Sequence, residues 1–172
     1  MAPDQRRLDP ERLGDHLDRL YRAAWAMCGR REDAEDLVQE VYAKVLARPR
    51  YIRGDDDLAY LVRVLRNVFV SQYRAAQRRP QPALLPEDLD IADRRTGSRP
   101  EEALQAREVF AVISALPDDY RDALVAVDVA GLTYREAARV LGTKEATITS
   151  RLHRARAKVA AGMESAPQGV PG

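Results

Sequence analysis

The sequence predicts an all-α protein built from two small helical domains. Apolar residues recur every three or four positions through most of the chain, which is the spacing of one helix face, and no segment shows the alternation typical of a strand. Four prolines and several acids fill residues 80–100, which we interpret as a flexible linker. We therefore expect a first domain at 9–79, a second domain at 101–163 and a disordered tail at 164–172.

The first domain is predicted to contain three helices. Asp9 followed by Pro10 is a favourable helix start, and Gly29 is a favourable end for the first helix. The second helix opens at Glu32 and stops before Pro49, and the third runs from about 57 to 78. The apolar stripes are Leu13, Leu17, Leu20, Tyr21, Ala24, Trp25 and Cys28 in the first helix; Ala34, Leu37, Val38, Val41, Tyr42, Val45 and Leu46 in the second; and Leu58, Leu61, Val62, Leu65, Val68, Phe69 and Gln72 in the third.

The second domain is predicted to end in a helix-turn-helix. A helix begins near Glu101, the chain breaks at 116–119, and a further helix closes at Gly131. Within 132–158, Thr133 and Glu136 stand at capping-box spacing, Gly142 is a plausible stop, and Thr143 can cap the last helix. The inner faces are Ala137, Ala138 and Leu141, then Ile148, Leu152, Ala155 and Val159. The outer face of the last helix is cationic and rich in hydroxyls, which suits a DNA major groove.

Charge is unevenly distributed along a chain whose net charge is only +1. Residues 58–79 carry five arginines and no acid, and residues 131–163 carry seven basic residues and two acids. The segments before and between these two are acidic. The sequence therefore predicts two separate nucleic-acid surfaces, which the net charge conceals.

The composition argues against several function classes. The single cysteine, Cys28, excludes an internal disulfide and is expected to be buried. The chain has no Cys/His cluster for zinc and no glycine-rich phosphate loop, so no cofactor is expected, and neither His16 nor His153 sits in a catalytic constellation. No apolar run reaches membrane-spanning length and no signal-peptide core is visible, so a cytoplasmic protein is expected.

Three segments of this layout resemble the extracytoplasmic-function (ECF) sigma factors of bacterial RNA polymerase. They are EDAEDLVQEVYAKVL at 32–46, LAYLVRVLRNVFVSQYRAAQRR at 58–79 and the stretch from ALPDDY to RARAKV at 115–159. They are similar to regions 2.2, 2.3–2.4 and 4 of that family, in that order. The resemblance implies a promoter-specificity subunit without catalytic chemistry, which binds core RNA polymerase, recognises the −10 and −35 elements and helps to open the duplex. It also implies an anti-sigma factor as a partner.

The resemblance assigns a polar strip on the second helix to core RNA polymerase. A solvated helix face is the usual explanation for such a strip, but AEDLVQE resembles the segment that docks on the polymerase clamp. Acids and an amide at this place would pair with basic groups of the partner and fix the register. The strip consists of Glu35, Asp36, Gln39 and Glu40.

The third helix carries the predicted surface for the −10 element on the non-template strand. Like charges at helical spacing repel, and a nucleic-acid backbone would relieve this repulsion; a merely solubilising face is the alternative. The loop at 48–56 resembles the family segment that pockets a flipped base, with Tyr60 and Tyr73 as candidate stacking platforms. Tyr60 and Ser71 stand where the family often has Trp and Asp, which leaves the base preference open. The predicted residues are Arg63, Arg66, Asn67, Val70, Ser71 and Arg74.

The last helix carries the predicted surface for the −35 element. Phosphate contacts position such a helix and base-edge contacts specify the sequence. Arg154 is suited to a bidentate guanine contact, whereas His153 is as readily explained by an exposed histidine without a role. Thr149 stands where the family often has a basic residue. The predicted set is Lys144 and Arg151, which are predicted to contact phosphates, Ser150, His153 and Arg154, which are predicted to approach the −35 element, and Thr147 and Thr149, which complete it.

Two other function classes compete with this interpretation. A stand-alone regulator would use the helix-turn-helix as a dimer, but no dimer seam is visible and the basic third helix would have no purpose. A helical adaptor without a DNA role is disfavoured by the two basic segments. The sequence leaves the placement of the two domains open, and one hypothesis is that the acidic linker masks a basic face.

Overall fold

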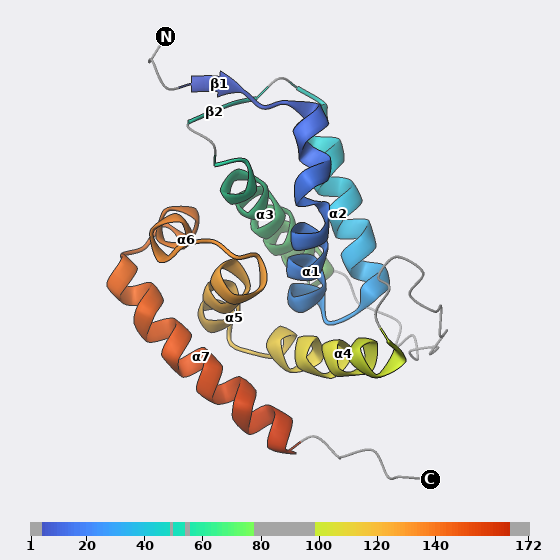
Figure 1. The fold of residues 1–172 in the computed structure, drawn as a ribbon, viewed down its shortest axis with the longest axis vertical. Coiled ribbons are helices and arrows are strands. Elements are labelled where there is room, and N and C mark those ends of the chain that lie inside the picture. The colour runs from blue at the N-terminus through green and yellow to red at the C-terminus, as the bar shows by residue number, and fades with distance from the viewer. Residues whose placement is uncertain (1–4, 49, 54–55, 78–98, 166–172) are drawn as a thin grey trace.

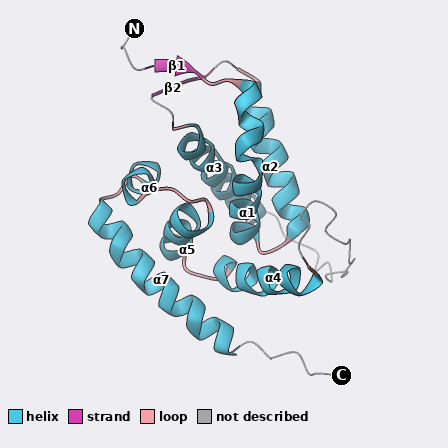
Figure 2. Ribbon diagram, viewed as in Figure 1, coloured by secondary structure: helices cyan, strands magenta, loops and turns pink. Residues whose placement is uncertain are grey.

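The computed structural model describes residues 5–48, 50–53, 56–77 and 99–165, and this part of the chain is predominantly helical (Figures 1 and 2). Most of the expected linker (78–98) and the end of the expected tail (166–172) lie outside the described residues. The elements are β1 (Gln5–Arg7), a 3₁₀ helix η1 (Pro10–His16), α1 (Leu17–Cys28), α2 (Arg31–Leu46), β2 (Tyr51–Arg53), α3 (Asp57–Gln77), α4 (Pro100–Ser114), α5 (Asp118–Leu124), a π-helical turn η2 (Val125–Val129), α6 (Tyr134–Leu141) and α7 (Glu145–Ser165).

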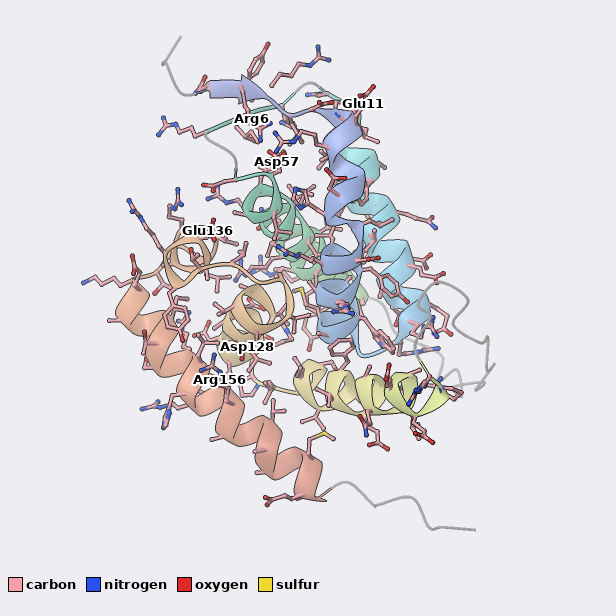
Figure 3. All side chains as sticks on the ribbon, viewed as in Figure 1. Arg6, Glu11, Asp57, Asp128, Glu136 and Arg156 are labelled. Atoms are coloured by element: carbon pink, nitrogen blue, oxygen red, sulfur yellow. The ribbon has the colours of Figure 1, made fainter. Side chains whose placement is uncertain are left out.

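Two short strands correct the expectation that the chain contains none. β1 and β2 pair antiparallel, with Arg6 opposite Ile52, and the Leu8 N–H donates to the Arg50 carbonyl at 2.8 Å. Arg6 also forms an ion pair with the fully buried Asp57 at the start of α3 (Figure 3). Strands of three residues are too short to show an alternating pattern, so no sequence pattern indicates them.

The first helix begins as expected but changes its geometry. The Asp9 carboxylate accepts from the Glu11 N–H at 3.0 Å, and Pro10 occupies the first helical position. The chain then follows a 3₁₀ helix to His16 before α1 starts, and Gly29 ends α1 with φ of 77°. Leu17, expected in the core, is exposed. The tighter 3₁₀ turn explains this error. A 3₁₀ helix has fewer residues per turn than an α-helix, so residues that follow it no longer face the side predicted from 3.6 residues per turn.

Most expected core positions of α2 and α3 are confirmed. Tyr42 is half-buried, and its hydroxyl donates to the Leu13 carbonyl at 2.7 Å. Leu46, however, is 54% exposed at the last position of α2, and Gln72 is exposed. Positions 71–76 of α3 are all exposed, so this end of the helix extends beyond the packed core. Gln72 instead donates its amide to Glu40 on α2.

The C-terminal helices confirm most of the predicted helix-turn-helix. Pro117 separates α4 from α5, and the π-helical turn η2, in which the Ala130 N–H donates to the Val125 carbonyl at 2.8 Å, was not expected. Gly142 ends α6 with φ of 63°. Ala137 and Ala138 are buried and the half-buried Leu141 packs against the core, as expected, and Val140 is buried in addition. Lys144, not Thr143, directly precedes α7, and α7 continues to Ser165 instead of stopping at 163.

The N-terminal and C-terminal groups of helices pack against each other around α1, as Figure 1 shows. Trp25 of α1 is 6% exposed and lies edge-on to Phe110 of α4, with ring centroids 5.0 Å apart. Ala23, Ala24 and Ala26 are buried and let neighbouring helices approach α1 closely. Buried residues of both groups form one continuous cluster. None of the described helices is long and apolar enough to cross a membrane.

Candidate polymerase and nucleic-acid surfaces

The polar strip of α2 lies on the face opposite its buried stripe. Glu35, Asp36 and Gln39 are exposed, and Glu40 is half-buried. Glu40 forms an ion pair with Lys44 one turn later, at 3.4 Å, in addition to its hydrogen bond from Gln72. Three members of the strip are therefore available to a partner, whereas Glu40 also connects α2 with α3.

The predicted −10 face of α3 is open toward its C-terminal end and is contacted by other helices at Arg63 and Arg66. Asn67, Ser71 and Arg74 are exposed, and Val70 is half-buried. Tyr73 is exposed and stacks on Phe69 with ring centroids 6.2 Å apart, whereas Tyr60 is half-buried and packs against the core. Tyr73 is thus the better-placed of the two stacking candidates. Pro49, Gly54 and Asp55 of the expected base-binding loop lie outside the described residues.

Arg63, which stays exposed, and Arg66, which is half-buried, contact the C-terminal helices. Arg66 Nε donates to Asp122 Oδ2 of α5 at 2.7 Å, and Arg63 Nη2 donates to the Arg139 carbonyl of α6 at 3.3 Å. The Arg139 guanidinium in turn lies 3.2 Å from Asp56, just before α3. The sequence placed these two arginines on an open DNA face, but the structure places α5 and α6 against them.

The predicted −35 face of α7 is presented by a well-defined helix-turn-helix. Thr133 and Glu136 form both hydrogen bonds of the capping box: the Thr133 N–H donates to Glu136 Oε2 at 2.7 Å, and the Glu136 N–H donates to Thr133 Oγ1 at 3.2 Å. These bonds, with the backbone bond as the largest cause, lower the pKa of Glu136 below its ordinary value. Figure 3 shows Glu136 at the start of α6. The box fixes the start of α6, and the tight turn at Gly142 then leads into α7.

Along α7, the predicted DNA-facing residues are mostly exposed. Lys144, Thr149, Ser150, His153 and Arg154 are exposed, while Thr147 and Arg151 are half-buried. The Thr149 and Ser150 hydroxyls donate to carbonyls of their own helix, at 3.1 and 3.0 Å, which leaves their oxygens free to accept. Ile148, Leu152 and Ala155 are buried, as expected, so the opposite face points outward.

Sequence reasoning missed the part that α5 plays at both surfaces. Asp119 of α5 pairs with Arg151 at 2.9 Å, and the Tyr120 hydroxyl lies 3.5 Å from Arg154 Nη1. Asp122 of the same helix forms the ion pair with Arg66 that is described above. The sequence analysis treated 116–119 only as a break. The available signal was the set of acids at 118, 119 and 122, which complements two basic helices elsewhere in the chain.

Among the described residues, no group of three or more His, Cys, Asp or Glu side chains could hold a metal ion. Cys28 is half-buried, and burial, more than the nearby Asp33, raises the pKa of its thiol to about 12. The thiol is thus protonated at neutral pH. The arrangement that the structure offers is one of charged and hydroxyl-bearing surfaces on helices.

Comparison with known families identifies two segments. Residues 13–79 match the family described as Sigma-70 region 2, and residues 106–159 match the family described as Sigma-70, region 4. These matches contain α1, α2 and α3 in the first segment, and α5, α6 and the greater part of α7 in the second. All predicted surface residues lie within the two matched ranges.

Relatives of known name cover most of the chain. The ECF RNA polymerase sigma factor EcfG of Rhodopseudomonas palustris is 36% identical over 142 residues, which are 80% of this chain and 75% of that protein. The ECF RNA polymerase sigma factor SigE of Mycolicibacterium smegmatis is 33% identical over 150 residues, which are 85% of this chain but only 58% of that protein. The chain therefore spans little more than half of the mycobacterial relative.

A solved structure shows the same arrangement of elements. The sigma factor RpoE of Bartonella quintana, in a co-crystal structure with the anti-sigma factor NepR, superposes with a TM-score of 0.66 at 25% identity, and the match covers 91% of this chain and 96% of that one. CnrH, in complex with the cytosolic domain of CnrY, superposes with a TM-score of 0.62 at 22% identity and shows the fold alone.

Proposed function

The chain belongs to the extracytoplasmic-function RNA polymerase sigma factors of the sigma-70 family, and we propose that it divides promoter recognition among three separate surfaces. The observation that carries this proposal is the order of the matches. A region 2 unit whose last helix is basic and carries no acid after Asp57 precedes a region 4 unit with a capped helix-turn-helix in the same chain. A stand-alone regulator needs only the second unit.

The first surface binds core RNA polymerase. Asp36 and Gln39 project from the exposed face of α2, and Glu35 extends the same strip by one turn. Carboxylates and an amide on a rigid helix pair with basic groups of a partner and fix its register. Glu40 supports this face through its bonds to Lys44 and Gln72.

The second surface binds the non-template strand of the −10 element. Arg74 at the open end of α3 supplies a cation for the backbone, and Tyr73 supplies a ring on which a base can stack. Asn67 and Ser71 lie between them and two further arginines, where their polar groups can hydrogen-bond bases. Arg63 and Arg66 lie further along the same face, where Arg66 is paired with Asp122 of α5 and Arg63 bonds the Arg139 carbonyl.

The third surface binds the duplex −35 element in its major groove. Lys144 and Arg151 contact phosphates, and Arg154 lies where a guanidinium can reach a base edge. Ser150 and His153 occupy the same exposed face of α7. Thr147 and Thr149 present hydroxyls instead of charged groups. This face of α7 therefore recognises the DNA sequence with few cationic side chains.

The remaining properties follow from this assignment. We infer that the chain performs no catalytic step of its own and acts in the cytoplasm, where RNA polymerase is. An anti-sigma factor is an expected partner, because the RpoE structure that resembles this chain is a complex with the anti-sigma factor NepR.

Two variants and two assays test the division into surfaces. Gln39→Ala with Glu40→Ala is expected to weaken co-elution with core RNA polymerase on size exclusion, whereas Arg154→Ala is expected to leave co-elution intact. In transcription from a promoter selected by the holoenzyme, Arg154→Ala should reduce the use of the −35 element about tenfold, within the 1–3 kcal/mol of one bidentate base contact.

A matched control is the double variant Arg107→Ala with Glu108→Ala, which removes two exposed side chains of α4 outside all three surfaces. It should behave like the wild type in both assays. Asp36→Ala separates docking from helix packing, since Asp36 is exposed and Glu40 also bonds to α3. Equal loss of both activities in the Gln39/Glu40 and Arg154 variants would contradict separate surfaces.

A further inference from the structure

The strand β1 lies before the segment that matches region 2, and it adds a second strand to the loop before α3. Residues 5–7 form β1, whereas the match begins at residue 13. β1 pairs antiparallel with β2, so that Gln5 stands opposite Arg53 and Arg7 stands opposite Tyr51. The two strands form a short ribbon, the β1–β2 ribbon, beside the start of α3 (Figure 1).

The two faces of the β1–β2 ribbon differ in chemistry. Successive side chains of a strand point to opposite faces. On the inner face, Ile52 is 6% exposed and Arg6 pairs with the buried Asp57. The other four side chains form the outer face, and all of them are exposed: Gln5, Arg7, Tyr51 and Arg53.

The ribbon is anchored at its inner face and at one end. The Leu8 N–H donates to the Arg50 carbonyl at 2.8 Å, which continues the ladder by one residue, and the Leu8 side chain is buried. The ion pair of Arg6 with Asp57 connects β1 to the first turn of α3. A rigid support reduces the conformational entropy that a binding surface loses, so the outer face is preorganised.

The outer face carries two cations that no described acid neutralises. None of the ion pairs between described residues uses Arg7 or Arg53. By contrast, Arg151 and Arg156 of α7 each pair with a carboxylate, at 2.9 and 2.7 Å. The two ribbon arginines are therefore available for an anion, and arginine binds phosphate through two parallel hydrogen bonds.

Tyr51 indicates which kind of polyanion fits this face. It is 64% exposed and lies opposite Arg7 and two positions from Arg53. Charged residues on a sheet edge can serve only to prevent aggregation, but that explanation leaves the exposed ring beside them without a purpose. A ring flanked by cations is typical of single-strand binding, in which bases stack on the ring and arginines contact the backbone.

We propose that the outer face of the β1–β2 ribbon binds the non-template strand where this strand passes the start of α3, with Arg7 of β1 as a phosphate contact. This inference rests on the proposed function of α3 and deepens it. The loop at 48–56 was already expected to receive a flipped base, and β1, which lies outside the matched segment, adds a contact to the backbone. The strand is then held near both ends of α3, because Tyr73 and Arg74 lie near the other end.

Fluorescence anisotropy of a fluorescein-labelled oligothymidine with the full chain at low salt tests the contact directly. Arg7→Ala and Arg53→Ala should each weaken binding several-fold. Each should also make the slope of log affinity against log salt concentration shallower by about 0.7, the value for one phosphate contact on a single strand. Tyr51→Ala should weaken binding about tenfold without changing this slope, because stacking on a ring neutralises no phosphate.

Three variants serve as controls. Arg107→Ala removes an exposed arginine of α4 outside the proposed surfaces, so it should change neither the affinity nor the salt slope. Arg7→Lys keeps the charge and should retain the slope, and Tyr51→Phe keeps the ring and should bind like the wild type. All these positions are exposed, so the helical circular-dichroism signal should be the same in every variant.

The lifetime of open complexes at a promoter selected by the holoenzyme tests the contact on the promoter strand. Arg7→Ala and Tyr51→Ala should shorten the lifetime several-fold after heparin is added, whereas Arg107→Ala should not. Co-elution with core RNA polymerase should be the same in all three variants, since the polymerase surface lies on α2.

Absence of oligothymidine binding by the wild type, or an unchanged affinity and salt slope in Arg7→Ala, would overturn the proposal. Weaker oligothymidine binding with unchanged lifetimes would also overturn it, because the ribbon would then not bind the promoter strand. Loss of co-elution in Arg7→Ala would overturn it by assigning the ribbon to a protein partner.

The proposed function is tested separately by the wild type. A wild type that does not co-elute with core RNA polymerase would refute the proposed function. A wild type that co-elutes, while Arg7→Ala changes neither readout, would reject only the ribbon contact.

Discussion

Single residues decide how well the helix-turn-helix is defined. Thr133 and Glu136 satisfy each other's backbone N–H groups at the start of α6, where helices otherwise leave donors unpaired. Gly142 takes a left-handed conformation that other residues adopt only at a cost, and it directs the chain into α7. Both features could be predicted from the sequence, because Thr133, Glu136 and Gly142 lie only three to nine positions apart along the chain.

The capping box leads to a prediction for stability. Thr133→Ala should lower the free energy of unfolding by about 1 kcal/mol, since one backbone N–H loses its acceptor. In thermal unfolding this is a decrease in Tm of about 2–4 °C for a chain of this size. Thr133→Ser keeps the hydroxyl and serves as the control; an equal loss in the Ser variant would show that the cap is unimportant.

The same cap should depend on pH. The pKa of Glu136 is lowered in the folded protein, so its contribution to stability is present above the ordinary glutamate pKa of 4.5 and is lost as pH falls through the lowered value. The difference in stability between the wild type and Thr133→Ala should therefore shrink in acid. Urea unfolding at pH 7 and near pH 3 measures it.

Cys28 provides a second prediction at this scale. Its pKa of about 12 means that the folded thiol stays protonated at a pH where an unfolded cysteine, near 8.5, forms a thiolate. Folding stability should thus decline above about pH 9, and a disulfide reagent should modify native Cys28 much more slowly than urea-unfolded Cys28. Equal rates in the two states would contradict a protected thiol.

At the scale of elements, β1 connects β2 with the start of α3. β1 pairs with β2, and Arg6 from β1 reaches Asp57, which is fully buried at the start of α3. Arg12 lies 3.9 Å from the same carboxylate. The segment at residues 5–7 therefore contacts both β2 and the start of the helix that carries the predicted −10 face.

Arg6→Ala should lower the free energy of unfolding by about 2 kcal/mol, the usual range for a hydrogen bond to a buried charged group. It should also speed amide exchange at Ile52, which lies opposite Arg6 in the strand register. Arg7→Ala removes an exposed arginine next to it and should change neither quantity. If both variants behave alike, the ion pair does not hold the loop.

At the scale of the whole molecule, a comparison of two glycines distinguishes the backbone cost of a substitution within one turn from its effect on the packing of the two halves. Gly29 and Gly142 are both left-handed, with φ of 77° and 63°. A Cβ at Gly29 would lie 2.5 Å from Ser114 Oγ of α4, whereas a Cβ at Gly142 would meet no atom within 4 Å. Only Gly29 is thus required for the close approach of the two halves.

Gly142→Ala should therefore lower stability by the backbone cost alone, about 1–2 kcal/mol. Gly29→Ala should lower it further and should increase the exposure of Trp25, which Gly142→Ala leaves unchanged. Urea unfolding followed by circular dichroism and by Trp25 emission measures both effects. Adding Ser114→Ala should recover part of the Gly29→Ala loss; equal losses in the two glycine variants would show that α4 does not depend on Gly29.

The sequence by itself determined the helices, their caps and the chemical character of three surfaces, because helical periodicity, capping spacing and charge are local properties of the chain. It also carried the family motifs at 32–46, 58–79 and 115–159. Its errors are local as well: Leu17 was misplaced where a 3₁₀ turn changed the phase of the helix, and η2 has no distinctive residue spacing.

Only the tertiary structure decided which charges meet. Arg66 and Asp122 are 56 positions apart, Arg63 and Arg139 are 76 apart, and Arg6 and Asp57 are 51 apart. No local pattern couples such positions, since their contact depends on how α3, α5 and α6 pack around α1. The sequence therefore predicted the DNA-binding faces, and the packing of the two halves determined that Asp122 of α5 pairs with Arg66 of the predicted face on α3.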